Sequence, residues 1–485
     1  MKKLNICFLL LPILLSSCKS KESNQSNISS STESGYIKED TKIDFLCMAD
    51  KDYHAKLQSM IDEFEILEPH VKVNLYNPQG SGSYAMIEKN IVAGFFKEDY
   101  PDLAQCYPDN VVKYIAKGYA VDVDKYLSNS DYGIVGNEID DYIDSFLLEG
   151  ATYPTSGTYS LPFCKSTELL YYNADALLNL DLSSIDANIN DGKPLDENYL
   201  NDLTWEELFD NLCPALYTYN SSLSEEDKIL KSGTNSAVFT YDSDENFFIT
   251  LANQYGYGYT SVDGNGKASI DFDNPEMKGL VRKLKDAKDA NYLQTRGSNR
   301  DYVSTLFQDR KALFTISSTA GLTYNYSYNN PFNIGVAKIP HAEGKDYSSI
   351  NQGPSVCILD HDDDNRSLAS YLLWKHMTNE ENSSAWALHT GYMGIRNSSY
   401  HSKEYIDALN VDDPSNLFDV AKAKNLKMIS EVRESTFNTK VFKGSSNART
   451  NVGLLLRDCL LSNDIDNEID SLFSSYALDA KSYLS

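Results

Sequence analysis

Polar residues stand where predicted strands end, and their types suit a ligand rich in hydroxyl groups. Asp109 follows the predicted strand 102–106, and its carboxylate can accept paired hydrogen bonds from neighbouring hydroxyls. Tyr84 follows the Gly/Ser run 80–83 at the start of a predicted helix, where free backbone amides can bind hydroxyl or phosphate oxygens. Arg449 precedes the last long amphipathic helix and offers a guanidinium fork. The alternatives are a plain helix cap at Tyr84 and a solvated Arg449.

Catalytic and metal-binding signatures are absent from the sequence. It contains no GxxxxGK[ST], GxSxG or HExxH motif, so it predicts neither ATP hydrolysis nor an enzyme, and no cofactor. Asp360, Asp362 and Asp364 alternate as in a calcium loop, but Asn365 and Tyr371 stand where that loop needs Gly and Glu. We therefore predict no metal site there, and read the run as the cap of a helix.

The charge excludes one class of partner. The 485 residues include 43 basic and 70 acidic side chains, which gives a net charge of −27. Phosphate backbones need clustered Lys and Arg, so a nucleic-acid partner is not expected. The 34 tyrosines suit a sugar-like ligand, although a general compositional habit explains them equally well.

The N-terminal sequence predicts where in the cell the protein is located. Lys2 and Lys3 precede the apolar run 6–15, which is too short to span a bilayer and is typical of a signal peptide at 1–17. The run ends in the sequence LSSC, which resembles the bacterial lipobox and predicts lipidation at Cys18. Residues 18–40 are rich in Ser, Asn, Lys and Glu and predict a flexible tether. We expect a protein that is lipid-anchored on the extracellular face of a bacterial cell membrane.

The remaining cysteines do not form a metal or redox motif. No CxxC spacing occurs, which disfavours zinc ribbons and thioredoxin chemistry. Buried free thiols are the favoured interpretation, and a disulfide stays open. The six residues are Cys47, Cys106, Cys164, Cys213, Cys357 and Cys459.

Alternating elements must position these residues. Strands are predicted at 43–49, 71–76 and 102–106, separated by helices at 53–67, 83–97 and 110–117. This βαβ rhythm predicts a parallel sheet covered on both faces, with ligands beyond the carboxyl ends of its strands.

A second block begins near Gly157. It contains a predicted strand at 168–172, a helix capped by Thr204 with Glu207, and a hairpin turn at 264–266.

Four segments in order carry a family resemblance. They resemble motifs of the extracellular solute-binding lipoproteins of ABC importers, of the type that binds sugars or glycerol 3-phosphate. The segments are YSLPF at 159–163 with LYYN at 170–173, TWEEL at 204–208, RKALFTISS at 310–318 and WALHTGY at 386–392.

The resemblance implies an α/β, two-lobed periplasmic-binding-protein-like fold (type II), with interleaved lobes joined by a multi-crossover hinge. By analogy the chain crosses near Gly157, Gly353 and Asp413. Lobe 1 is then 41–157 plus 353–412, and lobe 2 is 158–352 plus 413–485. The implied function is capture of a carbohydrate in the interlobe cleft and delivery to a permease served by a separate ATPase.

The resemblance also selects residues for the cleft. Ser166 matches a ligand-contacting Ser, sugar binders place a stacking aromatic in the loop of Tyr324, and Tyr392 belongs to the last motif. Gly353 permits close backbone approach at a crossing. Together with the residues above, the candidate ligand-binding set is Tyr84, Asp109, Lys165, Ser166, Ser317, Ser318, Tyr324, Gly353, Tyr392 and Arg449.

Two alternatives remain at this point. The same fold could bind glycerol 3-phosphate or a glycerophosphodiester, although Pro108 stands where the glycerol-phosphate members carry Glu. A lipid-anchored glycoside hydrolase with paired carboxylates, or an adhesin, is the alternative of another class.

Overall fold

The first sheet begins as the sequence predicts and ends differently. The computed structural model describes residues 35–48, 51–78, 84–96, 99–299 and 302–484. Parallel strands β1 (Thr41–Leu46), β2 (Val71–Tyr76) and β3 (Leu103–Cys106) lie in the order β2-β1-β3. The expectation of a fully parallel sheet is wrong beyond β3. Strand β13 (Ser355–Ile358) returns from the other half of the chain antiparallel to β3, and β4 (Leu161–Pro162) pairs with it.

Helices cover this sheet through apolar stripes. α1 (Lys51–Leu67) buries Leu57, Met60, Ile61 and Phe64, which share one helix face. α15 (Asp364–Met377) packs against α1 and β1 although it comes some 300 residues later. The other helices of this lobe are α2 (Tyr84–Gly94), α3 (Pro108–Ala116), α4 (Asp124–Leu127), α5 (Asn137–Asp141), α6 (Asp144–Glu149), α15 (Asp364–Met377) and α16 (Glu380–Thr390).

The second sheet has the order β11-β5-β10-β6-β9. Its strands are β5 (Glu168–Asn173), β6 (Phe239–Tyr241), β9 (Leu293–Thr295), β10 (Phe314–Ser318) and β11 (Ile334–Lys338). β6 runs parallel to β10 and β9, while β5 runs antiparallel to β10 and β11. The predicted hairpin is confirmed as β7 (Thr260–Val262) and β8 (Ala268–Ile270).

The helices of the second lobe come from the middle and the end of the chain. The predicted cap is confirmed, because the Glu207 amide donates to Thr204 Oγ1 and the Thr204 amide donates to the Glu207 carboxylate. α19 (Ser445–Leu461) packs on α10, α11 and α20. The main helices are η2 (Glu207–Leu212), α9 (Cys213–Ser222), α10 (Asp244–Tyr255), α11 (Pro275–Asp289), α18 (Leu417–Val432) and α20 (Ile465–Ser482). The shorter ones are α7 (Ala174–Leu177), α8 (Glu197–Leu200), α12 (Arg296–Asn299), α13 (Val303–Gln308) and α14 (Leu322–Asn325). α17 (Lys403–Leu409) contacts both α16 of the first lobe and α18 of the second.

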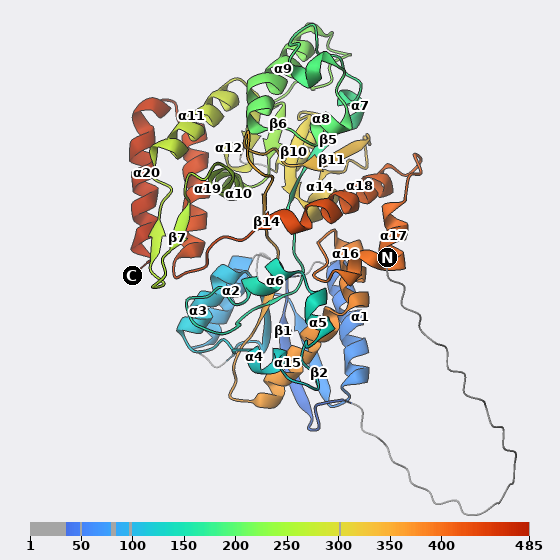
Figure 1. Ribbon diagram of the computed structural model, residues 1–485, viewed down its shortest axis with the longest axis vertical. Helices are drawn as coiled ribbons and strands as arrows, with labels where there is room; N and C mark the ends of the chain where they lie inside the picture. Colours follow the sequence, from blue (N-terminus) through green and yellow to red (C-terminus); the bar gives the residue numbers. More distant parts are fainter. Residues whose placement is uncertain (1–34, 49–50, 79–83, 97–98, 300–301, 485) are drawn as a thin grey trace, which may run out of the picture.

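The chain therefore forms an α/β fold of two interleaved lobes. Figure 1 shows the blue and much of the orange chain together in the lower lobe, and the green, yellow and red chain in the upper one. The chain leaves the first sheet between Pro162 and Glu168, later than the expected boundary at 157, because β4 still pairs with β13. It returns between Ile350 and Ser355. Strands β12 (Ser349–Ile350) and β14 (Thr436–Phe437) pair beside these crossings, and the exact lobe limits stay a prediction.

Gly353 is required where two crossings touch. Its φ is +96°, and an added Cβ would lie 2.6 Å from the Cys164 carbonyl oxygen and 2.8 Å from the Lys165 Cα. Ser166 and Gln352 exchange two backbone hydrogen bonds beside it, at 2.9 and 2.8 Å. A side chain at residue 353 would therefore push the two hinge segments apart.

The cysteines of the described part of the chain fit the sequence analysis. All six folded-part cysteines are buried and free, as the favoured interpretation predicted. Among the described residues, no helix is both long enough and apolar enough to cross a bilayer, and no cluster of side chains has the make-up of a metal site.

We expect Gly353→Ala to destabilise the protein by about 1–3 kcal/mol, because the residue needs a positive φ and the Cβ meets backbone. Urea unfolding measures the change. Gly264→Ala is the matched control, since nothing lies within 4 Å of its Cβ position, and we expect a change within about 0.5 kcal/mol. Equal midpoints for both variants would contradict the close approach at the hinge.

Candidate ligand-binding site

A polar cavity of about 460 Å³ lies between the lobes. Both sheets supply its walls, and Gln352 of the hinge reaches it as well. Its size falls within the range typical of small-molecule sites. The lining residues are Glu88, Tyr107, Asp109, Asn110, Glu168, Asp242, Ser243, Glu245, Asn246, Ser318, Gln352, Ser446, Arg449 and Thr450.

The wall from the first lobe is built on the turn from β3 into α3. The Asn110 side chain accepts a hydrogen bond from the Tyr107 amide and donates one to Glu88. Glu88 also pairs with Lys113 at 2.6 Å. Asp109 Oδ1 accepts a 2.5 Å hydrogen bond from Ser445 Oγ at the start of α19, so this carboxylate already bridges the two lobes. Asp109 lies in the interlobe cavity, and its contact with ligand stays a prediction.

The wall from the second lobe is built on the turn from β6 into α10 and on α19. Arg449 Nη2 donates to Asn246 Oδ1, and Asn246 Nδ2 donates to Glu168 at 2.8 Å. The Tyr241 hydroxyl donates to the second oxygen of Glu168. This chain of hydrogen bonds fixes the guanidinium of Arg449 on the cavity wall.

Burial sets the proton affinity of the cavity carboxyls. It raises the pKa of Glu168 to about 7, although the hydrogen bonds from Tyr241 and Asn246 and the charge of Arg449 oppose the shift. It raises the pKa of Asp242 to about 6 against the charge of Arg296. The pKa of Asp109 is raised as well, by the same loss of solvent. These carboxyl groups therefore hold protons near neutral pH more readily than exposed ones.

Tyr392 lies near other tyrosines, one of which lines the cavity. Burial is the main cause that raises the pKa of Tyr392, and Cys164, Tyr107, Tyr53 and Tyr324 are close enough to add to the shift. Tyr107 also lines the polar cavity, so it connects the two regions. Aromatic faces beside hydroxyl-binding groups suit the two sides of a sugar ring.

Three predicted residues belong to the hinge and not to the cavity wall. Lys165 is fully buried, and its Nζ pairs with Glu149, with the Ser355 hydroxyl at 3.1 Å and with the Gly353 carbonyl at 3.4 Å. Ser166 uses its backbone to pair with Gln352. The prediction that Lys165, Ser166 and Gly353 contact ligand therefore finds no support in their positions, because their contacts join hinge segments.

The candidate residues at the end of β10 and in the loop after it differ in their positions relative to the cavity. Ser318 lines the cavity and accepts a hydrogen bond from the Ala320 amide, while Ser317 is buried beneath it near Asp242. Tyr324 is 65 % exposed, and its place as the stacking residue stays a prediction.

Two predicted positions fall outside the described residues. Helix α2 begins at Tyr84, but the side chain of Tyr84 is not described. Cys18 lies in the segment 1–34, which is not described either.

The sequence analysis missed the segment that supplies most of the upper wall. Asp242, Ser243, Glu245 and Asn246 follow β6 directly. The same rule that selected Asp109, a polar turn after a parallel strand, applies to them. The signal is weak because β6 is only three residues long.

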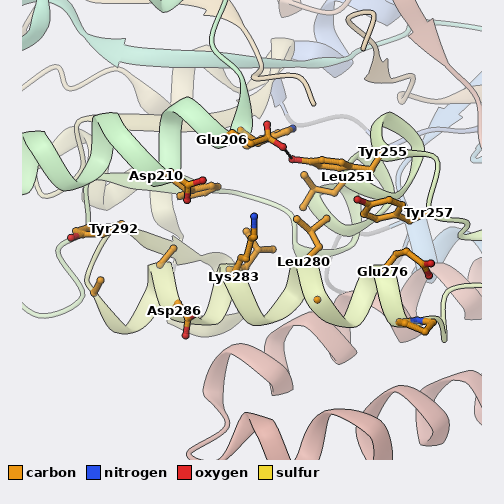
Figure 2. Close-up of a pocket in the computed structure, with 17 residues that line it drawn as sticks. Glu206, Asp210, Leu251, Tyr255, Tyr257, Glu276, Leu280, Lys283, Asp286 and Tyr292 are labelled. Atoms are coloured by element: carbon orange, nitrogen blue, oxygen red, sulfur yellow. Dashed lines mark hydrogen bonds between the residues drawn. The ribbon is translucent and has the colours of Figure 1, made fainter. Parts of the chain in front are cut away.

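A second cavity, of about 560 Å³, lies wholly within the second lobe. We call it the α11 groove. Figure 2 shows Lys283 pointing from α11 across the groove toward the helix of Asp210, and Tyr255 bonded to Glu206. Trp205, Phe209, Tyr255, Tyr257 and Tyr292 line it, and no residue of the first lobe does. Lobe closure would not enclose a ligand there, so its residues provide controls for the interlobe site.

Comparisons with known proteins identify a matching family and structures of the same fold. The sequence model described as bacterial extracellular solute-binding protein matches residues 59–412. No curated protein sequence matches the chain.

Solved structures of the same fold are numerous. UgpB from Mycobacterium tuberculosis, in complex with glycerophosphocholine, has a TM-score of 0.68 at 16 % identity, with 92 % of this chain and 98 % of that chain covered. The GacH receptor of Streptomyces glaucescens, crystallised unliganded and with acarbose, has a TM-score of 0.65 at 15 % identity. The match covers 91 % of this chain and 99 % of that chain. Maltose-bound MalE3 from T. maritima has a TM-score of 0.62 at 14 % identity, again with 91 % of this chain and 99 % of that chain covered. At these identities the likeness establishes the fold.

We expect Glu168 to make folding stability fall as pH rises from about 4.5 to about 7. Its folded pKa lies above its ordinary value, so the native state binds more protons than the unfolded state in that window, and the native state loses this advantage as pH rises. Glu168→Gln mimics the neutral form. Its stability relative to the unsubstituted protein should therefore rise by about 3 kcal/mol between pH 4.5 and pH 8. Urea unfolding at both pH values measures this, and parallel pH curves would show that Glu168 is not held protonated.

Proposed function

The chain belongs to the bacterial extracellular solute-binding protein family, and we propose that it captures a carbohydrate between its lobes for an ABC importer. The family and the similar structures are solute-binding proteins and not enzymes. Membership also gives an extracellular location. The observation that carries the carbohydrate proposal is the lining of the interlobe cavity. Carboxylates, amides and hydroxyls from both lobes surround one small space there.

The cavity chemistry favours hydroxyl groups over phosphate. Free oxygens of Asp242 and Glu245 accept hydrogen bonds, which hydroxyls donate and a phosphate dianion does not. Among the described lining residues, Arg449 is the one basic side chain, and it is already bonded to Asn246. Glycerol 3-phosphate or a glycerophosphodiester, the class of ligand in the UgpB structure, is the alternative for the same cavity.

The delivery route completes the proposal. A signal peptide at 1–17 and lipidation at Cys18 would hold the protein on the outer face of the cell membrane. Residues 18–34 would act as a tether between the anchor and the lobes. The predicted tether limit at residue 40 is too late, because the amides of Tyr36 and Ile37 donate to Glu68 and Ile37 is buried in the first lobe. Capture would be followed by delivery of the ligand to a membrane permease with a separate ATPase. Metabolic labelling with an alkyne fatty acid tests the anchor, and Cys18→Ala should abolish the label.

A thermal-shift screen of residues 37–485 tests the ligand class. A ligand that binds only the folded state stabilises it by RT ln(1 + [L]/Kd), about 2.7 kcal/mol at a hundredfold excess over Kd. We expect sugars, mono- or oligosaccharides, to raise Tm and glycerophosphodiesters to leave it unchanged. A shift only with glycerophosphodiesters would select the alternative ligand, and release of a cleaved product would contradict a binding protein.

We expect Asp109→Ala to weaken carbohydrate binding by about 10-fold to 100-fold, because it removes a charged acceptor from the cavity. Titration calorimetry with the sugar found in the screen measures the loss. Asp286→Ala, in the α11 groove, is the control and should leave affinity within about 2-fold. The urea midpoint of each variant shows whether the lobes stay folded, and equal affinity for both would place the ligand elsewhere.

We expect Tyr392→Ala to weaken binding by about 2-fold to 10-fold through the loss of an aromatic face beside the cavity. Calorimetry on Tyr392→Ala and Tyr392→Phe separates the ring from the hydroxyl, because Phe keeps the face. If Phe binds as poorly as Ala, the hydroxyl and not the ring carries the contact.

A further inference from the structure

The cavity contains more carboxyl groups than basic groups that could neutralise them. Five acidic side chains line it, from Glu88, Asp109, Glu168, Asp242 and Glu245, against Arg449 among the described residues. Lys113 lies behind the wall and neutralises Glu88 in a 2.6 Å ion pair. Arg449 lines the cavity with the other four carboxyl groups. Arg296 and Arg457 line a pocket that shares Asp242 and Glu245, but among the described residues neither arginine forms an ion pair with them.

Neutral donors, and not cations, satisfy two of these four groups. Asp109 accepts from the Ser445 hydroxyl, and Glu168 accepts from the Tyr241 hydroxyl and the Asn246 amide. Such hydrogen bonds steady a carboxylate but leave its charge in place.

The remaining two have unused oxygens. Asp242 Oδ1 is shielded from solvent and has no hydrogen-bond partner. In the described part of the chain, the Glu245 carboxylate likewise has neither a hydrogen bond nor an ion pair. Both stand at the turn from β6 into α10, so their free oxygens lie on one wall of the cavity.

The proton affinities agree with a shortage of positive charge. Burial raises the pKa of Glu168 and of Asp242 even though Arg449 acts on the first and Arg296 on the second. Glu245 adds to the rise at both, and Asp244 adds at Asp242. The cations of the protein therefore leave part of the cost of burying these carboxyls without compensation.

We infer that the ligand of the interlobe cavity is an amino sugar, a carbohydrate whose protonated amino group sits against Asp242 and Glu245. The inference rests on the proposed function, since it specifies the charge of the carbohydrate. An ammonium group supplies three hydrogen-bond donors and one positive charge to two carboxylates with free oxygens. A neutral sugar supplies the donors without the charge, and a phosphorylated sugar adds negative charge to a negative wall.

Matched sugars that differ in charge test the inference on residues 37–485. Calorimetry at pH 7 compares glucosamine, galactosamine and mannosamine, and the 1,4-linked disaccharides of glucosamine, with the corresponding hexoses, N-acetyl derivatives and 6-phosphates. We expect at least one amino sugar to bind 10-fold or more tightly than its neutral partners. Equal or tighter binding of the neutral sugars overturns the amino-sugar assignment and leaves the proposed function intact. Binding of no carbohydrate overturns both.

Charge-neutral substitutions of similar shape locate the ammonium group. Asp242→Asn and Glu245→Gln should each weaken binding of the best amino sugar by about 10-fold more than they weaken binding of its neutral partner. Glu276→Gln, in the α11 groove, is the control and should change neither. A uniform loss for charged and neutral sugars would show a packing role for these residues and contradict the assignment.

Proton release gives an independent readout. A bound cation lowers the pKa of nearby Glu168 and Asp242, so the complex should release protons at pH 6.5. The calorimetric enthalpy of the amino sugar should therefore vary with the ionisation enthalpy of the buffer, while that of its neutral partner should not. An enthalpy independent of the buffer contradicts the placement of the charge.

Discussion

The buried ammonium group of Lys165 holds the crossing on which both lobes depend. Lys165 is fully enclosed, and its Nζ contacts Glu149 from α6, the Gly353 carbonyl and the Ser355 hydroxyl at the start of β13. One side chain therefore joins three segments, at 149, 165 and 353–355. A buried charge without its partner is costly, so these segments cannot separate without exposing or stranding it. The absence of a side chain at Gly353 lets the two crossings approach that closely.

The cavity lies above this fixed point, and its walls inherit their positions from it. β5 starts three residues after Lys165 with Glu168, and β13 starts two residues after Gly353 with Ser355. Glu168 thus extends from the hinge directly into the cavity, where it organises Asn246 and, through Asn246, Arg449. Hydrogen bonds satisfy this network, but among the described lining residues Arg449 is the one basic side chain against five carboxyl groups of the cavity. Such an arrangement lowers the stability of the empty protein and makes a ligand of the right charge stabilising.

Features held by contacts between residues close in sequence could be predicted from the sequence, whereas features held by distant contacts could not. Local patterns identified β1 to β3, the helices between them and the cap at Thr204, because the deciding contacts lie within a few residues. The pairing of β13 with β3 joins residues about 250 positions apart, which no local pattern encodes. Lys165 belongs to the predicted ligand-binding set, but its contacts join segments of the hinge. No local sequence pattern identifies Glu149 and Ser355 as the partners of Lys165.

Coupling between ligand and closure follows from where the carboxylates stand. Asp109 belongs to the lower lobe, whereas Glu168, Asp242 and Glu245 belong to the upper one. Moving the lobes together brings these like charges closer, which opposes closure, while the bond from Ser445 to Asp109 favours it. A ligand that donates hydrogen bonds to both walls shifts this balance, because it binds the closed arrangement better than the open one. A positively charged ligand does so most strongly, since it also offsets the repulsion between the carboxylates of the two walls.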